Sequence, residues 1–230
     1  MSDLAIKLYD PNEDPTNYTV VGDKKMGKTT LIKTLITMLK KNNEACIAYD
    51  RLFQFEDILP CYDFGSQIPS GVNKQFCLRR ENVTNFFAIA EEYRKQILRE
   101  NPRGRLYVII DELDTVYGTT GPIAPDPLTK ERLRDWIDYS RHLRVEMWGC
   151  VRRPQRIWMN YYEQSNRIFL FHTSGGLARE KLLQTIGSKE MLRAIAKLPK
   201  YEFIVYPDEL EDYDNVKGNL LNFNNTEKEE

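Results

Sequence analysis

A glycine-rich segment near the start of the sequence has the residue types that bind phosphate. Residues 22–29 read GDKKMGKT, the Walker A pattern of glycine, four residues, glycine, lysine and threonine. Glycines let successive backbone N–H groups turn toward a phosphate, and the start of a following helix adds the positive end of its dipole. We therefore predict a nucleotide phosphate site made of Gly22, Asp23, Lys24, Lys25, Met26, Gly27, Lys28, Thr29 and Thr30.

Two side chains of this segment have specific expected roles. Lys28 should reach the β- and γ-phosphates, and the Thr29 hydroxyl should bind Mg²⁺. The alternative is a chance glycine-lysine turn. The flanks favour the phosphate site, because an apolar run at 18–21 precedes the segment and apolar residues at helical spacing follow it.

An acidic pair ends a second apolar run. The segment LYVIIDELD places Asp111 and Glu112 directly after that run, which is the Walker B arrangement. A carboxylate there can hold the water shell of Mg²⁺, and its neighbour can polarise an attacking water. We predict that Asp111 serves the metal and that Glu112 is the general base, whereas Asp114 is interpreted as surface charge. Beside a Walker A pattern, the pair favours ATP hydrolysis over a solvated strand end, so ATP and Mg²⁺ are the expected cofactors.

Short β-rich runs alternate with amphipathic helical stretches, which predicts an α/β fold with a mainly parallel central sheet flanked by helices. The predicted strands are 18–21, 45–49, 105–110, 145–150, 167–171 and 202–206, and helical spacing recurs at 31–39, 83–97 and 133–143. Gly/Pro-rich loops are predicted at 65–73 and 117–128. The predicted organisation is an N-terminal extension (1–17), one ATPase domain (18–206) and a polar acidic C-terminal tail (207–230).

Composition limits the partners and the compartment. The 33 basic and 34 acidic residues do not give the overall positive charge of a stand-alone nucleic-acid binder, so any DNA contact must be local. No apolar stretch approaches the ~20 residues of a membrane helix, and no signal pattern opens the sequence, which predicts a cytoplasmic protein without membrane insertion. The scattered cysteines are predicted to be buried free thiols, not zinc ligands or disulfides: Cys46, Cys61, Cys77 and Cys150.

The segment RHLRVEMWGCVRRP (141–154) resembles a region of the HerA and FtsK superfamily of DNA-pumping ATPases that reads R-x-x-G-[IV]-x-[LM]-x-x-A-T-Q-R-P. The residues that match in type are Arg141, Val145, Met147, Arg153 and Pro154. Arg144 replaces the family's glycine and Arg152 replaces its sensor glutamine. ACIAYDRLFQFED resembles the family's second strand, which ends here in Asp50, and KLPKYEFIVY resembles its closing L-x-x-G-E-F strand. The resemblance runs from about Tyr18 to Tyr206 and implies a RecA-like P-loop NTPase of the additional-strand, catalytic-glutamate class.

The resemblance also implies a ring, usually a hexamer, with ATP at subunit boundaries and DNA in the central channel. It makes Arg141 the first candidate for an arginine finger that acts on the neighbouring subunit; an ordinary helix-end cation is the equal alternative. Arg152 becomes a possible γ-phosphate sensor. Arg153 and Arg156 become candidates for DNA backbone contacts, with nucleotide binding or surface charge as alternatives. The weaker finger candidates are Arg79, Arg80 and Arg144, and the aromatic residues Trp158, Tyr161 and Tyr162 are interpreted as core or subunit interface.

The short chain most resembles the compact members of this superfamily, which include viral genome-packaging ATPases. The leading hypothesis is therefore a motor that moves double-stranded viral DNA into a preformed capsid, with a capsid or portal-vertex protein as partner, in the host cytoplasm or at the packaging vertex. A plasmid or phage ATPase that transfers or extrudes DNA is the first alternative. A nucleotide-dependent switch or a small-molecule P-loop kinase is an alternative of another class.

Overall fold

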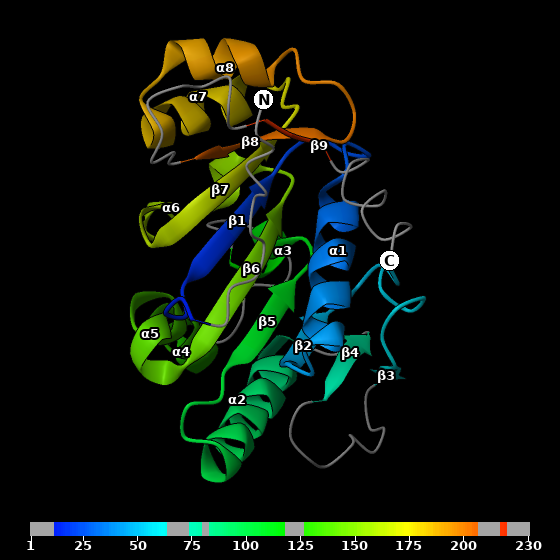
Figure 1. Cartoon of the computed structure of the whole chain (residues 1–230). Coiled ribbons are helices and arrows are strands. Elements are labelled where there is room, and N and C mark those ends of the chain that lie inside the picture. The colour runs from blue at the N-terminus through cyan, green and yellow to red at the C-terminus, as the bar shows by residue number, and fades with distance from the viewer. Residues whose placement is uncertain (1–11, 64–73, 80–82, 118–126, 207–216, 220–230) are drawn as a thin grey trace.

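The computed structural model describes residues 12–63, 74–79, 83–117, 127–206 and 217–219. The predicted loop 65–73, most of the loop 117–128, most of the tail 207–230 and Arg80 lie outside these ranges. The described residues form one layered α/β arrangement (Figure 1).

The described strands form one nine-stranded sheet in the order β3-β4-β2-β5-β6-β1-β7-β8-β9. All pairs from β3 to β7 are parallel, and β8 and β9 add on in antiparallel orientation. The prediction of a mainly parallel sheet is confirmed. The bounds are β1 Asn17–Val21, β2 Ala45–Tyr49, β3 Cys61–Asp63, β4 Gln75–Arg79, β5 Leu106–Ile110, β6 Val145–Val151, β7 Ser165–Phe171, β8 Glu202–Tyr206 and β9 Lys217–Asn219.

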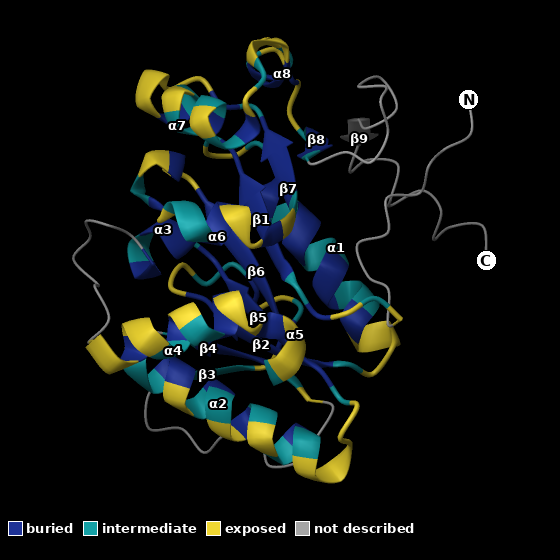
Figure 2. Cartoon of the chain, turned by 90° about the vertical axis from the view of Figure 1, so that its left-hand side faces the viewer, coloured by how far each residue is buried: buried dark blue, intermediate teal, exposed yellow. Residues whose placement is uncertain are grey.

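Helices cover both faces of the sheet. In Figures 1 and 2, α1 lies on one face, while α2, α4 and α6 lie on the other. Right-handed crossovers require this, because the chain moves one way along the sheet through α1 and the opposite way through α2. The bounds are α1 Lys28–Lys41, α2 Val83–Glu100, α3 Leu113–Val116, α4 Pro127–Asp138, α5 Ser140–Leu143, α6 Met159–Glu163, α7 Gly176–Ile186 and α8 Lys189–Ile195, with a 3-10 turn, η1, at Pro154–Arg156.

Burial on both faces explains the near-continuous apolar character of the central strands. Every residue of β1, β2, β5 and β6 is buried. The apolar stripe of α1 is buried at Leu31, Ile32, Leu35, Ile36 and Leu39, and Figure 2 shows the outer faces of the helices exposed. Because β5, β6 and β1 are parallel neighbours, their carboxyl ends lie side by side at one edge of the sheet.

Some elements differ from the sequence prediction. The helix expected through 133–143 is two helices, because the backbone leaves helical geometry at Tyr139, with φ −122° and ψ 25°. The short strands β3 and β4 and the helices α6, α7 and α8 were not predicted. The strand β9 pairs with β8, so the sheet continues into the segment assigned to the C-terminal tail.

The prediction of four free thiols is wrong for one pair. Cys61 and Cys77 form a disulfide, whereas Cys46 and Cys150 are buried free thiols as predicted. The disulfide follows from the sheet: Cys61 of β3 is the direct partner of Cys77 of β4, and their Cα atoms lie 4.6 Å apart. This pairing was hidden because neither short strand was predicted.

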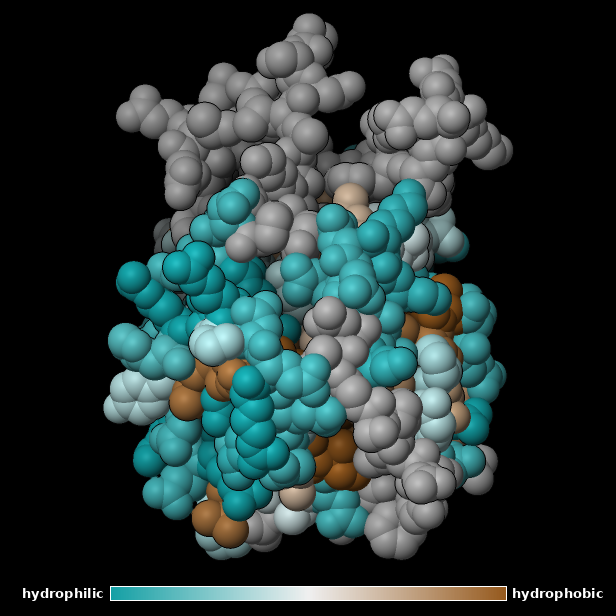
Figure 3. Space-filling model, turned by 60° about the horizontal axis from the view of Figure 1, so that its bottom comes forward, coloured by the Kyte–Doolittle hydropathy of each residue, from teal (hydrophilic) through white to brown (hydrophobic). Residues whose placement is uncertain are grey.

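The outer surface of the described residues is largely polar. Figure 3 shows a mostly hydrophilic face with small, separate hydrophobic patches. The exposed large hydrophobic side chains are Leu52, Leu128, Tyr139, Trp158 and Leu177. No helix within the described ranges is long and apolar enough to cross a membrane.

Candidate nucleotide-binding site

The glycine-rich segment forms the loop between β1 and α1, at the carboxyl edge of the parallel strands. Both neighbours of β1 hold this loop: Gly22 N–H donates to the Val151 carbonyl (3.2 Å) and Asp23 N–H donates to the His172 carbonyl (2.8 Å). Glycine is required at position 22, since a Cβ there would lie 2.6 Å from the Phe171 Cβ. The loop is thus fixed before any ligand binds.

The side chain of Asp23 stabilises the loop by hydrogen bonds to a residue outside it. Its carboxylate accepts hydrogen bonds from the Ser174 N–H (2.9 Å) and the Ser174 hydroxyl (2.7 Å). Lys25 and Gly27 have positive φ values of 66° and 119°, which turn the backbone before α1 begins at Lys28. Asp23 therefore supports the loop, and its carboxylate is directed to Ser174.

Lys28 lies inside the loop that it closes. Its ammonium donates to the carbonyls of Gly22 (2.7 Å) and Asp23 (2.8 Å), and the residue is only 8% exposed. Burial lowers the pKa of Lys28, and the nearby Asp111 opposes this shift. The geometry places a buried cation at the base of the pocket, where the predicted phosphate contact requires it.

Asp111 and Thr29 supply the oxygen ligands that Mg²⁺ prefers. Both line the same pocket, and Asp111 follows directly after β5. Burial raises the pKa of Asp111 to about 6, with further contributions from Glu112 and Asp50. The described residues contain no group of three or more metal-ligating side chains, so a bound Mg²⁺ would also use nucleotide phosphates and water. The residues present fit a magnesium ion delivered with a nucleotide.

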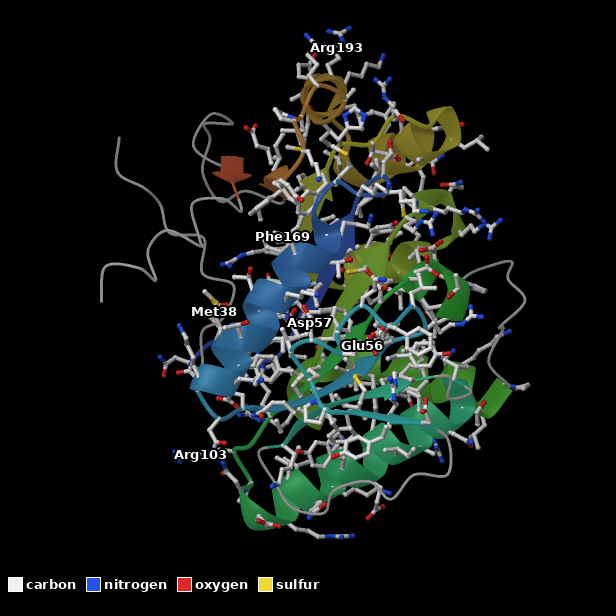
Figure 4. The ribbon with its side chains drawn as sticks, turned by 90° about the vertical axis from the view of Figure 1, so that its right-hand side faces the viewer. Met38, Glu56, Asp57, Arg103, Phe169 and Arg193 are labelled. Carbon is white, nitrogen blue, oxygen red and sulfur yellow. A yellow bond between two sulfur atoms is a disulfide. The ribbon has the colours of Figure 1, made fainter. Side chains whose placement is uncertain are left out.

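Asp50 shapes the loop that follows β2. Its buried carboxylate accepts hydrogen bonds from the N–H groups of Gln54 (2.9 Å) and Phe55 (2.8 Å). Figure 4 shows the next residues of this loop, Glu56 and Asp57, beside α1, and Asp57 accepts from Lys33 of α1 at 2.7 Å. These contacts present Leu52 and Gln54 to the pocket.

Glu112 forms a short ion pair with Arg152. Arg152 Nη1 lies 2.6 Å from Glu112 Oε1, and the Glu112 side chain is 13% exposed. The Glu112 backbone has φ 57° and ψ 49°, so the chain turns sharply where β5 ends and α3 begins. A non-glycine residue in this conformation costs on the order of 1–3 kcal/mol and is maintained only by its surroundings. The predicted general base and the predicted sensor thus contact each other directly.

The interpretation of Asp114 as surface charge is wrong. Asp114 is 3% exposed, and its Oδ1 accepts a hydrogen bond from the Arg152 N–H at 3.0 Å. The sharp turn at Glu112 starts α3 immediately and directs Asp114 inward under the end of β6. Asp114 therefore fixes the backbone from which the Arg152 side chain extends.

These residues enclose one pocket of about 440 Å³. It includes predicted residues from the loop, the acidic pair and the end of β6. It also includes residues that sequence reasoning missed: Leu52, Gln54, Cys150, Lys200 and Tyr201. Lys200 and Tyr201 come from the turn before β8, inside the segment that resembles the closing strand, but that pattern gave neither residue a role in the site. Tyr201 has φ 71°, and its N–H donates to the Met26 carbonyl at 2.9 Å.

The described candidates for an arginine finger do not line this pocket. Arg141 lies in α5, just before β6 begins, and hence at the opposite edge of the sheet from its own pocket; its Nε lies 2.9 Å from Asp14 Oδ2. Arg79 is paired with Glu56 (3.1 Å) and Asp63 (3.3 Å). Arg144 donates to the backbone carbonyls of residues 103 and 104 and has φ 57°. Glycine adopts that left-handed conformation readily, and the superfamily that this segment resembles has glycine at this position.

The candidate DNA residues lie beside and within η1, beyond the end of β6. Arg153 is exposed and precedes η1, and Arg156 is partly exposed at its end. Tyr161 and Tyr162 are buried, which agrees with their interpretation as core, while Trp158 is 51% exposed. The structure brings Arg152 into the pocket and leaves Arg153 at the surface.

Comparisons with known proteins agree at the level of fold. No protein-family model matches the sequence, and a search of curated proteins finds no match. Among solved structures, the chain is similar to the genome-packaging NTPase B204 of Sulfolobus turreted icosahedral virus 2 in complex with AMPPCP, with TM-score 0.66, 22% identity and coverage of 86% of this chain and 93% of that one. The chain shares the fold of this viral packaging NTPase.

Two further solved structures support the same fold. The DNA-packaging ATPase B204 of Sulfolobus turreted icosahedral virus matches with TM-score 0.65 and 20% identity over 89% of this chain and 96% of that one. VirB4 of Thermoanaerobacter pseudethanolicus matches with TM-score 0.60 and 9% identity over 82% and 86%. The predicted P-loop ATPase fold and the resemblance to compact viral packaging ATPases are confirmed.

Asp111→Asn is expected to stabilise the nucleotide-free chain at pH 7.5. The folded chain holds the Asp111 proton more tightly than the unfolded chain does, since the pKa rises from 3.8 to about 6. Folded stability therefore falls as pH rises between these values, and the full penalty acts above the upper one. An amide removes this penalty, and Tm should rise by about 2–4 °C for each kcal/mol relieved.

Thermal unfolding at pH 7.5 and pH 5 tests this prediction. The stabilisation should shrink at pH 5, where the wild-type carboxyl is mostly protonated. The control is Asp57→Asn, because Asp57 is exposed and its hydrogen bonds from Lys33 lower its pKa, so its loss should not raise Tm. An Asp111→Asn chain that is less stable than wild type at pH 7.5 would show that this carboxylate is net favourable.

Proposed function

We propose that the chain hydrolyses ATP in this pocket and uses the energy to move DNA, specifically to package double-stranded viral DNA into a preformed capsid. The observation that carries the proposal is the convergence of the Walker A loop, the acidic pair and Arg152 on one pocket. The fold likeness to packaging NTPases supports the DNA part of the proposal.

The roles of the residues follow from their positions. Lys28 and the loop N–H groups hold the β- and γ-phosphates, and Thr29 and Asp111 hold the metal. When bound, Mg²⁺ neutralises charge on the phosphates during transfer. Glu112 accepts a proton from the water that attacks the γ-phosphorus, while the bond to the β-phosphate oxygen breaks and ADP leaves. Arg152 stabilises the negative charge that develops on the γ-phosphate oxygens.

A ring, with a hexamer as the leading form, fits the placement of Arg141. This residue is 71% exposed in its side chain and lies across the sheet from its own pocket, so it can serve as a finger only for a neighbouring copy. Its contact with Asp14 is an exposed pair, and such pairs contribute little to stability. The Arg141 side chain can therefore leave Asp14 when two copies meet. A capsid or portal-vertex protein is the remaining proposed partner. The host cytoplasm is the proposed location of the chain.

DNA contact is assigned to Arg153 and Arg156, which lie one turn beyond the pocket. Cations at this position bind backbone phosphates without sequence preference. A change in the Arg152 backbone on ATP hydrolysis, with release of its hydrogen bond to Asp114, would reach this turn directly, because η1 begins two residues later. The arrangement links the chemical step to a DNA-binding segment over a few residues.

ATP turnover with and without long double-stranded DNA tests the proposal. We expect DNA to stimulate phosphate release, and the stimulation to weaken between about 50 and 200 mM salt, because phosphate contacts release counterions. Combined Arg153→Ala and Arg156→Ala substitution should reduce the stimulation. Turnover that is indifferent to DNA at both salt concentrations would contradict a DNA motor and favour a switch or a kinase, which transfer of phosphate to a small molecule would then identify.

A DNA-transfer ATPase is the second candidate function. It is favoured by the fold likeness to the pCW3 conjugation coupling protein TcpA, with TM-score 0.54 and 16% identity over 84% of this chain and 57% of that chain. Stimulation by single-stranded DNA above that by double-stranded DNA would favour transfer over packaging.

A further inference from the structure

Tyr201 occupies an unusual backbone position beside the phosphate loop. Its φ of 71° lies in the left-handed region that bulky side chains rarely adopt. Its N–H donates to the Met26 carbonyl at 2.9 Å, which joins the turn before β8 to the phosphate loop. Strained conformations of this kind persist where the surroundings enforce them, and they concentrate at ligand sites.

The local sequence makes the choice of tyrosine informative. The segment 198–203 reads LPKYEF, and the closing strand that it resembles has the pattern L-x-x-G-E-F, so tyrosine stands where that pattern has glycine. Glycine would adopt this backbone conformation without strain. Tyr201 instead brings a partly buried ring that packs against the core and also lines the pocket. The aromatic ring therefore adds an apolar surface to the pocket that glycine could not supply.

The sheet order sets the direction of a bound nucleotide. Glu112 and Arg152 follow β5 and β6, which lie on one side of β1, whereas Tyr201 precedes β8, which lies on the other side. The phosphate that is cleaved must face Glu112 and Arg152. The opposite end of the nucleotide, its base, then extends toward the start of β8.

We infer that Tyr201 is the stacking surface for the base of the bound nucleoside triphosphate, an inference that rests on the proposed nucleotide site. Aromatic side chains stack on any base through its π-face, and purines offer the larger face. The ammonium of Lys200 lies 4.4 Å from the centre of the Tyr201 ring. Lys200 is exposed, so its side chain can move and leave a ring face to the base.

Calorimetric titration with ATPγS, a cytidine triphosphate and inorganic tripolyphosphate tests this inference, with Mg²⁺ present throughout. Tyr201→Gly should lower the affinity for ATPγS about tenfold, the size expected for one lost stacking contact, and leave tripolyphosphate affinity unchanged. Tyr201→Phe keeps the ring and should retain both affinities. The wild-type preference for ATPγS over the cytidine nucleotide should shrink in Tyr201→Gly.

The outcomes separate this inference from the proposed function. Equal losses for ATPγS and tripolyphosphate in Tyr201→Gly would show that the ring only supports the loop, and unchanged affinity for both would show that it does not contact the base; either overturns the inference. ATPγS binding that depends on Tyr201, in a chain that releases no phosphate from ATP with or without DNA, would uphold the inference and contradict the proposed function. A chain that binds none of the three ligands contradicts both.

Discussion

Glu112→Gln is expected to lower the kcat of ATP hydrolysis by a factor of about 10²–10⁴, which is the usual effect of losing a general base. Glutamine has nearly the same shape, and its amide oxygen can still accept the hydrogen bond from Arg152 that the carboxylate accepts at 2.6 Å. It cannot take the proton of the attacking water. ATP binding should therefore survive, and phosphate release and calorimetric affinity, measured side by side, should separate.

The control for this substitution is Glu92→Gln. Glu92 lies on α2, and its side chain is 65% exposed. Its ion pairs, at 3.6 and 4.0 Å, are too long and too exposed to contribute much to stability. The same chemical change there should leave kcat unaltered. If Glu112→Gln hydrolyses ATP at the wild-type rate, another residue activates water and the assignment of Glu112 is wrong.

Arg152→Ala is expected to lower kcat by about 10²–10³, the range found when one donor to developing charge is removed. Arg152 is the charged neighbour of Glu112, and Asp114 fixes its backbone through the Arg152 N–H. Arg152→Gln, which restores the residue type of the resembling superfamily, should retain more activity than Arg152→Ala. Arg193→Ala is the charge-matched control, since Arg193 is an exposed residue of α8 (Figure 4) and does not line the pocket.

A double-mutant cycle distinguishes two modes of action for Arg152. If Arg152 contacts the γ-phosphate, its removal should weaken ATPγS binding in the Glu112→Gln background as well as in wild type. If it only positions Glu112, Arg152→Ala should have no further effect on kcat once Glu112 is glutamine. Full activity in Arg152→Ala alone would remove Arg152 from the site.

The parts of the site that could be predicted are those in which local sequence determines local geometry. The segment 22–29 needs glycine at position 27 for its own backbone, which has φ 119° there, and the acidic pair follows a strand that is apolar throughout. These links between sequence and geometry involve residues that are close together in the chain. A short sequence pattern is therefore enough to predict them. The positions of the central strands along the sequence could be predicted for the same reason, because each of these strands is mostly apolar.

The parts that could not be predicted depend on contacts between distant segments. Tyr201 meets the phosphate loop only because β8 folds back beside β7, and Cys61 meets Cys77 only because two short strands pair in register. Asp114 is buried because the backbone turns at Glu112, a conformation that its sequence neighbours do not signal. The ion pair of Glu112 with Arg152 likewise joins residues 40 positions apart.

Phosphate release from ATP by the purified chain with Mg²⁺, beside Lys28→Ala, tests the central claim most directly. Lys28 is the buried cation of the loop, and its removal should abolish both ATP binding and turnover while the chain stays folded by circular dichroism. We predict steady turnover in wild type and none above background in Lys28→Ala. Equal turnover in both chains, or no turnover in wild type with DNA present, would contradict an ATPase site at residues 22–29.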